Sequence, residues 1–328
     1  MKRAAIFSFS ERGAALAARI AGELEDWSVE CHAPRGDLAA RAEELFSACD
    51  ALIFVGACGI AVRAIAPMVR AKTGDPAVIV ADELGRHVIA LLSGHIGGAN
   101  ALARRVAERI GGEAVITTAT DVNGRFSVDE WAARYGLRIL DMDAAKRFSA
   151  EILRRDLPLC SDFPIAGALP EGVYPGEDGP IGAAVSCGYR MPFAVTLPLV
   201  PPILHVGLGC RRGASAEAVR AAVDAALAEA GLRPEAVRAA ASIDIKRDED
   251  GLRDLGIPLR FYSAGELRAV PGEFSASEFV RKTVGVDNVC ERAAMRSAGP
   301  GAELLVSKRG ANGVTVAIAR EDWRVCFE

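Results

Sequence analysis

The sequence is poor in several features that mark particular protein classes. Aromatic residues make up only 6% of the 328 residues, which favours close packing of helices on sheets over an aromatic-rich β-sandwich. The eight cysteines form no C-x-x-C pair, so neither a zinc ribbon nor a redox motif of that type is expected. We interpret most of them as small buried hydrophobes in a reducing compartment. The four histidines are too dispersed along the chain to suggest a zinc site, and no bound metal is expected.

The chain also lacks an excess of positive charge and a long apolar run. Its net charge is −4, whereas a non-specific nucleic-acid binder normally has a basic face, so no nucleic-acid partner is expected. The longest apolar run, Val88–Leu92, has the length of a strand and is far too short to span a membrane. The first ten residues contain too short an apolar run for a secretory signal peptide. These features predict a soluble, cytoplasmic protein without a membrane partner.

What the chain does contain is a regular alternation of strand-like and helix-like segments. Its length favours two or three domains. The pattern predicts an α/β protein with several domains, in which mostly parallel or mixed sheets are covered by helices. We expect an N-terminal α/β domain at residues 1–125, a small middle domain with a linker at 126–202, and a C-terminal α/β domain at 203–328. In the first domain, strands are expected at Ala4–Phe9, Val29–Cys31, Ala51–Val55, Val78–Ala81, Val88–Leu92 and Ala114–Thr117, and helices at Gly13–Leu24, Leu38–Phe46, Ile60–Val69 and Gly97–Ile110.

The middle part differs in composition, because nine of the sixteen prolines lie between Pro158 and Pro202. Proline is excluded from helix interiors and central strands, so this part is expected to be irregular or edge-like. The segment Val195–Pro202 is interpreted as the linker to the last domain.

A glycine-rich segment that follows a predicted strand is the strongest functional signal. Leu91–Asn100 contains Ser93, His95 and Asn100 together with Gly94, Gly97 and Gly98, directly before a predicted helix. Glycines let a ligand approach the backbone, and amides at a helix N-terminus favour an anion. The segment is therefore a candidate carboxylate cradle with one titratable group, His95. The alternative is a tight turn with His95 as a capping or surface residue. Because G-x-S-x-G is absent, Ser93 is expected to donate a hydrogen bond rather than act as a nucleophile.

Two further strand ends carry candidate binding residues. Gly56 and Gly59 form a second strand–turn–helix segment, and Arg63 in its first helical turns would clamp a carboxylate. If the two strands are parallel neighbours, this turn lies beside the His95 segment; the alternative for Arg63 is a solvated helix position. Thr117, Thr118 and Asp121 would bind a polar ligand or, equally, form a capping turn. Lys72, Asp75 and Asp82 are expected to be solvated.

The last predicted domain has a glycine loop of its own. Gly207 and Gly209, with Cys210 and Arg211, follow a strand and precede a helix. The loop resembles a dinucleotide fingerprint superficially, with Asp244 at the position of a ribose-binding acid. The adjacent residues Arg211 and Arg212 indicate that the loop binds an anion, whether or not that anion is a dinucleotide. Lys246 and Lys308 would each bind a carboxylate or pair with nearby acids on the surface.

These segments together resemble the CbiG family, the cobalt-precorrin 5A hydrolases of cobalamin biosynthesis. The similar residues are spread along the chain, at Gly59–Pro67, Asp75–Val78, Leu91–Asn100, Ile116–Asp121, Val206–Gly213 and Ser242–Lys246, and at Glu291 and Lys308. The last domain also looks like CobE, a stand-alone protein of the aerobic pathway. The resemblance implies that water opens a δ-lactone of cobalt-precorrin 5A and that acetaldehyde then leaves to give cobalt-precorrin 5B.

For such a reaction we propose, as a hypothesis from the residues themselves, the following roles. His95 would accept a proton from water, and Ser93 or the amides of Gly97 and Gly98 would stabilise the oxyanion. The remaining candidates would bind a substrate lying between the first and last domains. No protein cofactor is expected, since the cobalt belongs to the substrate. The resemblance is also compatible with a homodimer and with handover to neighbouring pathway methyltransferases. Two other classes remain: a carrier that binds the tetrapyrrole without reaction, and a nicotinamide-dependent oxidoreductase using Gly207–Gly213.

Overall fold

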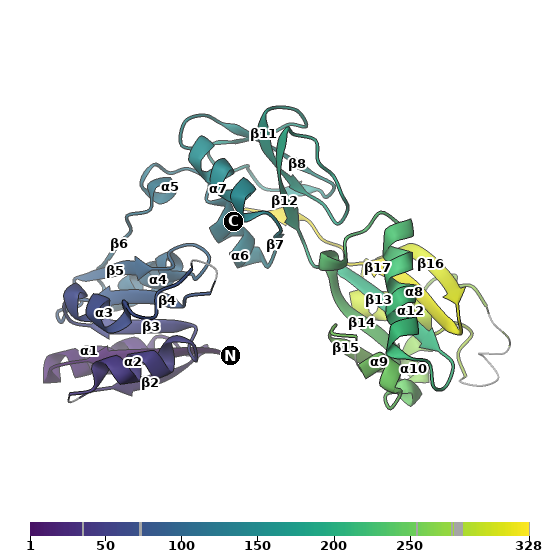
Figure 1. Ribbon diagram of the computed structural model, residues 1–328, viewed down its shortest axis with the longest axis horizontal. Helices are drawn as coiled ribbons and strands as arrows, with labels where there is room; N and C mark the ends of the chain where they lie inside the picture. The colour runs from purple at the N-terminus through teal and green to yellow at the C-terminus, as the bar shows by residue number, and fades with distance from the viewer. Residues whose placement is uncertain (35, 72–73, 254, 277, 279–284, 328) are drawn as a thin grey trace. The chain divides into compact units, whose positions relative to one another are not determined.

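The computed structural model describes the chain except for residues 35, 72–73, 254, 277, 279–284 and 328 (Figure 1). The chain divides into two compact units. The first contains Met1–Tyr135 with Ser149–Arg155, and the second contains Gly136–Phe148 with Asp156–Glu328. The three-part division at residues 125 and 202 stays a prediction.

The first unit is built on a six-stranded sheet in the order β2-β1-β3-β4-β5-β6. All neighbouring strands are parallel except β4 and β5, so the sheet is mixed, as expected for the fold class. The strands are β1 (Lys2–Ser8), β2 (Trp27–His32), β3 (Ala51–Val55), β4 (Ala77–Ala81), β5 (His87–Leu92) and β6 (Glu113–Val115).

Helices cover both faces of this sheet, and the alternating strand residues form two buried clusters. Ile6, Ile53 and Ile79 face one way, toward α1 and α4, and Phe7 and Phe54 face the other, toward α2 and α3. The helices of the unit are α1 (Glu11–Gly22), α2 (Leu38–Phe46), α3 (Cys58–Ile65), α4 (Ala99–Ile110), α5 (Ala119–Val122) and α6 (Val128–Tyr135), while α7 (Met142–Glu151) is shared between the units. The helix predicted at Ile60–Val69, with an early end at Pro67 as the alternative, is α3, which ends at Ile65 because proline cannot continue a helix.

The reversed strand β5 changes where the glycine turns lie. The short segment 82–86 joins β4 to β5 as a hairpin, in which Asp82 accepts hydrogen bonds from the amides of Leu84 and His87 at 2.8 and 2.6 Å. Leu92 therefore pairs with Val78, and the segment after β5 lies at the edge where β3 and β4 begin. The turn containing Gly56 lies at the opposite edge. The expectation that the two turns are side by side is wrong.

The second unit contains two five-stranded sheets and a two-stranded pair, β18-β9. The first sheet has the order β10-β8-β11-β12-β7, with β7 (Arg138–Ile139), β8 (Leu157–Ser161), β10 (Val173–Pro175), β11 (Ile181–Val185) and β12 (Val195–Val200). The second has the order β15-β14-β13-β17-β16, with β13 (Leu204–Cys210), β14 (Val237–Ile243), β15 (Leu259–Tyr262), β16 (Glu303–Ala311) and β17 (Val314–Arg320). The other elements are β9 (Ile165–Ala166), β18 (Val325–Cys326), α8 (Ala216–Glu229), η1 (Pro234–Ala236), η2 (Asp244–Lys246), α9 (Asp250–Arg253), α10 (Ala264–Arg268) and α12 (Cys290–Ala298).

The proline-rich region is more regular than its composition predicts. The expected linker Val195–Pro202 is mostly strand β12, which pairs with β11 from Val195 to Leu199. Strand β7 pairs only with Leu199 and Val200, so Pro198 lies outside that ladder and its missing N–H costs no bond to β7. A proline is tolerated here because only one side of the strand is paired at its position.

The last residues of the chain return to this region within the second unit. Val325 and Cys326 of β18 pair with Ile165 and Ala166 of β9. Close by in sequence to both strands, the rings of Phe163 and Trp323 make an edge-to-face contact with centroids 5.0 Å apart. Within the described part of the chain, no helix is both long and apolar enough to cross a membrane.

Candidate active site

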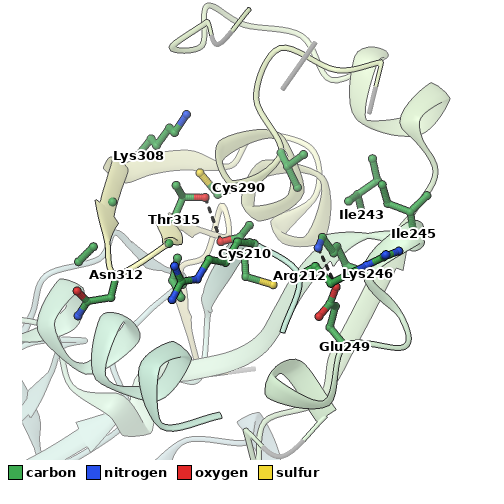
Figure 2. A pocket seen from close by; sticks show the side chains of 17 residues that line it. Cys210, Arg212, Ile243, Ile245, Lys246, Glu249, Cys290, Lys308, Asn312 and Thr315 are labelled. Atoms are coloured by element: carbon green, nitrogen blue, oxygen red, sulfur yellow. Dashed lines mark hydrogen bonds and ion pairs between the residues drawn. The ribbon is translucent and has the colours of Figure 1, made fainter. Parts of the chain in front are cut away.

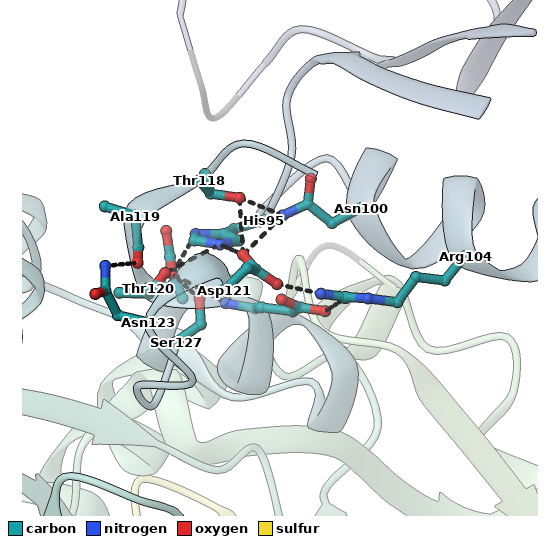
Figure 3. Close-up of polar contacts among 11 residues, drawn as sticks. His95, Asn100, Arg104, Thr118, Ala119, Thr120, Asp121, Asn123 and Ser127 are labelled. Carbon is teal, nitrogen blue, oxygen red and sulfur yellow. Dashed lines mark hydrogen bonds and ion pairs between the residues drawn. The ribbon is translucent and has the colours of Figure 1, made fainter. Parts of the chain in front are cut away.

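His95 lies between two carboxylates in the segment that joins β5 to α4. Its Nε2 atom is 2.8 Å from Oδ2 of Asp121, and its Nδ1 atom is 3.1 Å from Oδ1 of Asp129. The side chain is only 13% exposed. Figure 3 shows His95 and Asp121 within one connected group of polar side chains. Both ring nitrogens are engaged, so neither is free to accept a proton from water in this arrangement.

The two carboxylates keep His95 protonated at neutral pH. Burial alone would lower the pKa of the imidazole, but the hydrogen bonds and charges of Asp129 and Asp121 raise it to about 9. The group therefore differs from the near-neutral base that the sequence predicted. It is better described as an imidazolium that holds two carboxylates in place.

Asp121 is the more tightly held of these carboxylates. Its Oδ2 atom accepts hydrogen bonds from Thr118 Oγ1 at 2.7 Å and from Asn100 Nδ2 at 3.0 Å, and its Oδ1 atom contacts Arg104 (Figure 3). Burial would raise the pKa of Asp121, but the bonds from His95, Thr118 and Arg104 lower it. The buried Asn100 also donates to Thr118. The carboxylate of Asp121 is therefore held by donors from four side chains, one of which is His95.

Asp129 is held on one oxygen only. Its Oδ1 atom accepts from Ser127 Oγ at 3.0 Å, the Glu130 amide at 3.1 Å and His95. Among the described residues, no donor contacts Oδ2. Burial would raise the pKa of Asp129, but the hydrogen bond and charge of His95 lower it. Asp129 lines a cavity of about 340 Å³ together with Ser93, His95 and other residues, so a carboxylate with spare hydrogen-bonding capacity borders this cavity.

Arg104 and Glu130 are the other charged members of the cluster, which contains two cations and three carboxylates. The guanidinium of Arg104 contacts Asp121 and lies 3.5 Å from Glu130 Oε1. Burial, followed by the charge of Asp121, raises the pKa of Glu130. His95, Asp121 and Glu130 place potential ligand atoms within 4.8 Å of one another, and Arg104 and His95 both pair with Asp121. The arrangement is self-consistent as an acid–base cluster, and the absence of a metal stays a prediction.

Ser93 has two unfavourable features at once. Its backbone φ angle is 57°, a value that residues other than glycine rarely adopt. Its buried Oγ has no hydrogen-bond partner among the described residues. A left-handed conformation costs about 1–2 kcal/mol, and a buried unsatisfied hydroxyl costs about 1–3 kcal/mol. Such strain persists where a function depends on it. Ser93 also lines the 340 Å³ cavity, and its hydroxyl oxygen is itself buried.

The glycines beside His95 serve close packing more than amide donation. A Cβ atom at Gly97 would lie 2.4 Å from Ser93 Cβ, and one at Gly94 would lie 2.7 Å from Asn100 Oδ1. The amide of Gly98 donates to the carbonyl of His95 at 2.9 Å, so it is not free to bind an oxyanion. Neither Gly97 nor Gly98 lines the cavity. The expected oxyanion role of the Gly98 amide is therefore not supported by this geometry.

Other predicted residues divide between this site and distant positions. Thr117 and Thr118 line the cavity with His95, as their place after β6 predicts. Gly56, Gly59 and Arg63 do not line it, and the Arg63 guanidinium donates to the carbonyl of Gly59 at 3.2 Å within its own helix. The solvated-helix interpretation thus describes Arg63 better than a clamp at His95.

Part of this site was not predicted from the sequence. Asp75 was expected to be solvated, but it is buried, accepts hydrogen bonds from the Arg70 amide at 3.0 and 3.2 Å, and lines the cavity. Asp129 was assigned to the middle domain and was not predicted as a site residue. Lys72 lies outside the described residues.

A second, larger cavity of about 830 Å³ lies in the second unit, at the end of β13 (Figure 2). The predicted residues Gly209, Cys210, Arg211 and Lys246 all line it. Its other lining residues come from the segments around β14, α12, β16 and β17, and are Arg212, Ile243, Ile245, Glu249, Val289, Cys290, Lys308, Gly310, Ala311, Asn312, Gly313, Val314 and Thr315.

Gly207 has a packing role instead. A Cβ atom there would lie 1.8 Å from the carbonyl oxygen of Cys290, so the missing side chain lets α12 contact β13. Gly207 is not among the residues that line the cavity. Gly209 does line it, and a Cβ atom there would lie 2.5 Å from Thr315 Oγ1.

The loop after β13 is poorly arranged for a dinucleotide. The amide of Gly213 donates to Glu249 Oε2 at 2.9 Å, so a carboxylate of the chain already occupies the place where a phosphate would bind. The other oxygen of Glu249 lies 2.9 Å from Lys246 Nζ. Lys246 therefore pairs with Glu249, which is one of its two predicted alternatives, and its binding of a substrate carboxylate stays a prediction.

The fold and the two cavities define a class: an α/β protein of several sheets with an acid–base cluster at one cavity and a cationic rim at another. The chain belongs to the cobalamin synthesis G family, whose N-terminal model matches residues 40–121 and whose C-terminus model matches residues 204–319. It is 36% identical to the cobalt-precorrin-5A hydrolase of Salmonella typhimurium, over 96% of both chains. It is 31% identical to the protein of that name from Priestia megaterium, over 84% of this chain and 79% of the other. It is also 36% identical to CobE of Sinorhizobium, over 35% of this chain and 79% of that protein.

Proposed function

We propose that this chain is a hydrolase that opens the δ-lactone of cobalt-precorrin 5A and releases acetaldehyde, giving cobalt-precorrin 5B. The observation that carries the proposal is the similarity over nearly the full length of both chains to a cobalt-precorrin-5A hydrolase. The acid–base cluster around His95 supports it, because lactone hydrolysis needs a group that accepts a proton from water. The hydrolytic step is assigned to the 340 Å³ cavity, which this cluster borders.

In the first step, Asp129 accepts a proton from the attacking water. Its Oδ2 atom has no donor among the described residues, whereas both nitrogens of His95 are engaged. The imidazolium of His95 holds Asp129 through Oδ1 and is itself held in place by Asp121. The water oxygen forms a bond with the lactone carbonyl carbon. The ring C–O bond then breaks, which leaves a carboxylate and a hydroxyl group on the substrate.

Ser93 supplies the hydrogen bond that the tetrahedral oxyanion needs. Ser93 lines the same cavity, and its buried hydroxyl lacks a hydrogen-bond partner among the described residues. A donor that is already desolvated and oriented before the reaction loses little free energy when charge develops on the oxygen. This function explains why the strain at Ser93 is retained.

Release of acetaldehyde follows as a retro-aldol cleavage. The freed hydroxyl loses its proton, the carbon–oxygen double bond of acetaldehyde forms, and the carbon–carbon bond to the macrocycle breaks. The electron pair of that bond moves into the conjugated macrocycle. Because the substrate itself accepts these electrons, the reaction needs no protein cofactor, and the cobalt is part of the substrate.

A carrier function is the second candidate. It is favoured by the large cavity in the second unit, which would bind a tetrapyrrole without reaction. A carrier would bind the intermediate for handover to a neighbouring methyltransferase. The cytoplasmic location and the homodimer expected from the sequence remain predictions, which cell fractionation and light scattering of the purified protein would test.

The test is anaerobic incubation of the purified protein with cobalt-precorrin 5A, with acetaldehyde measured by a coupled alcohol dehydrogenase. Acetaldehyde above the rate without enzyme is the expected result. The Asp129→Asn variant is expected to bind the substrate but to lose at least about a hundred-fold in rate. Tight binding by the unaltered protein without acetaldehyde would replace the hydrolase with the carrier.

A further inference from the structure

The 830 Å³ cavity of the second unit has more positive charge than its own acids can balance. Among the described residues, four cationic side chains line it and Glu249 is the one acid that opposes them. Lys246 pairs with Glu249 at 2.9 Å. The side chains of Arg211, Arg212 and Lys308 form no ion pair with any described residue. Unpaired cations at a concave surface indicate an anionic ligand.

The walls between these cations are apolar. Ile243, Val289 and Val314 line the cavity, and Ile245, although 62% exposed, lines it as well. The thiols of Cys210 and Cys290 add to this surface, since burial raises the pKa of Cys210 and raises that of Cys290 to about 11. Both are neutral thiols at physiological pH. The ligand therefore needs an apolar body of considerable size as well as negative charge.

The distribution of the cations favours several separate carboxylates over one phosphate. Arg211 and Arg212 follow β13, Lys246 ends η2 and Lys308 lies on β16, so the positive charges come from three segments (Figure 2). The amide of Gly213, which would otherwise suit a phosphate, already donates to Glu249. In the described part of the chain, no aromatic side chain lines the cavity to stack on a nucleobase. A nucleotide therefore fits poorly, whereas a wide apolar ring with carboxylate arms fits well.

We infer that this cavity binds the macrocycle of a cobalt tetrapyrrole, with the ring against Ile243, Ile245 and Val314 and its carboxylate side chains on Arg211, Arg212 and Lys308. The inference rests on the proposed function, which supplies the class of ligand. The inference goes beyond the proposed function because it assigns ring recognition to this unit. It also assigns Arg212, Lys308 and Ile245 to the binding of the ring and its carboxylates. The volume of about 830 Å³ is that of a site for a large ligand.

The test is titration of the full chain with cobyrinic acid, a stable cobalt corrinoid with free carboxylates, followed by calorimetry. Arg212→Gln and Lys308→Gln are each expected to weaken binding about ten- to hundred-fold, since each removes a charge-assisted hydrogen bond. The matched control is Lys146→Gln, which removes the same charge from an exposed lysine of α7 and should leave the affinity unchanged. The methyl ester of cobyrinic acid, which lacks the negative charges, should bind at least about ten-fold more weakly than the acid.

A second variant separates binding from folding. Ile245→Ser removes an exposed apolar side chain, so it should fold normally and still weaken binding about five-fold through lost apolar contact. Unchanged affinity in Arg212→Gln, Lys308→Gln and Ile245→Ser, or equal binding of the acid and its ester, would overturn the inference. If cobyrinic acid binds as expected but cobalt-precorrin 5A yields no acetaldehyde, the hydrolase proposal fails and the cavity assignment stands. If acetaldehyde forms but the three variants bind cobyrinic acid normally, the hydrolase proposal stands and the cavity assignment fails.

Discussion

The Nδ1 atom of His95 lies 3.1 Å from Oδ1 of Asp129, while its Nε2 atom is held by a second carboxylate, that of Asp121. A histidine engaged on both sides by aspartates keeps its proton and loses the ability to act as the first acceptor. The relationship reverses the usual order of an Asp–His pair, because here the histidine orients the carboxylate that faces the cavity.

The pH dependence of the reaction distinguishes the two possible bases. If Asp129 accepts the proton, kcat/KM should be nearly constant around neutrality and should fall above a pH of about 9, where His95 loses its proton. If His95 were the base, activity would instead rise up to that pH. The measurement is the initial rate of acetaldehyde release, corrected for hydrolysis without enzyme. A rise through pH 9 would return the base assignment to His95.

The same histidine should make stability depend on pH. Its pKa is raised from 6.5 to about 9 in the folded chain, so the stabilisation is fully present below pH 6.5 and is lost as the pH rises through 9. Its size is on the order of 3 kcal/mol. The free energy of unfolding of the natural chain should therefore approach that of His95→Gln at high pH. His87→Gln, an exposed histidine at the start of β5, is the control, and an equal pH dependence in both variants would contradict the explanation.

Substitution of Ser93 should separate stability from activity. Ser93→Gly relieves the positive φ and removes the unsatisfied hydroxyl, so it should stabilise the chain by about 1 kcal/mol. The same change should lower kcat about a hundred-fold by removing the oxyanion donor. Ser93→Ala is the matched variant: it should lose the same activity but gain less stability, because the strained backbone remains. A fully active Ser93→Ala enzyme would exclude the hydroxyl from the reaction.

Gly207 should be intolerant of any side chain. In Gly207→Ala the new methyl group would lie 1.8 Å from the Cys290 carbonyl oxygen, and the backbone there cannot move aside cheaply. We expect destabilisation of about 3 kcal/mol or more, measured by denaturant unfolding. Gly22→Ala is the control, because no heavy atom lies within 4 Å of its new methyl group and alanine favours the helix. A harmless Gly207→Ala would show that the contact between β13 and α12 is looser than the structure indicates.

Much of the architecture could be predicted from local patterns. The strands β3, β4 and β5 and the helices α2 and α4 lie close to their predicted ranges, because buried apolar runs and amphipathic spacing are local properties. The direction of β5 was misjudged, although a signal existed. The segment 82–86 is too short to contain the crossover that two parallel strands require.

The site could be predicted only in part, because its members come together through tertiary packing. His95, Asn100, Thr118 and Asp121 were found because each follows a strand end at one edge of the sheet. Asp129 could not be found in this way, since it begins a helix and nothing local places it beside His95. Arg63 was overestimated for the opposite reason: its motif is local, but its strand ends at the other edge.

The pairing of β18 with β9 has a consequence for how the chain folds as it leaves the ribosome. Residues 165–166 pair with residues 325–326, which are synthesised much later. Strand β9 therefore stays unpaired until almost all of the second unit has been synthesised. The six-stranded sheet of the first unit needs nothing beyond residue 115 and can form early in synthesis. The acid–base cluster can therefore assemble while the ring-binding cavity is still incomplete, and truncations near Val325 should slow the maturation of the second unit selectively.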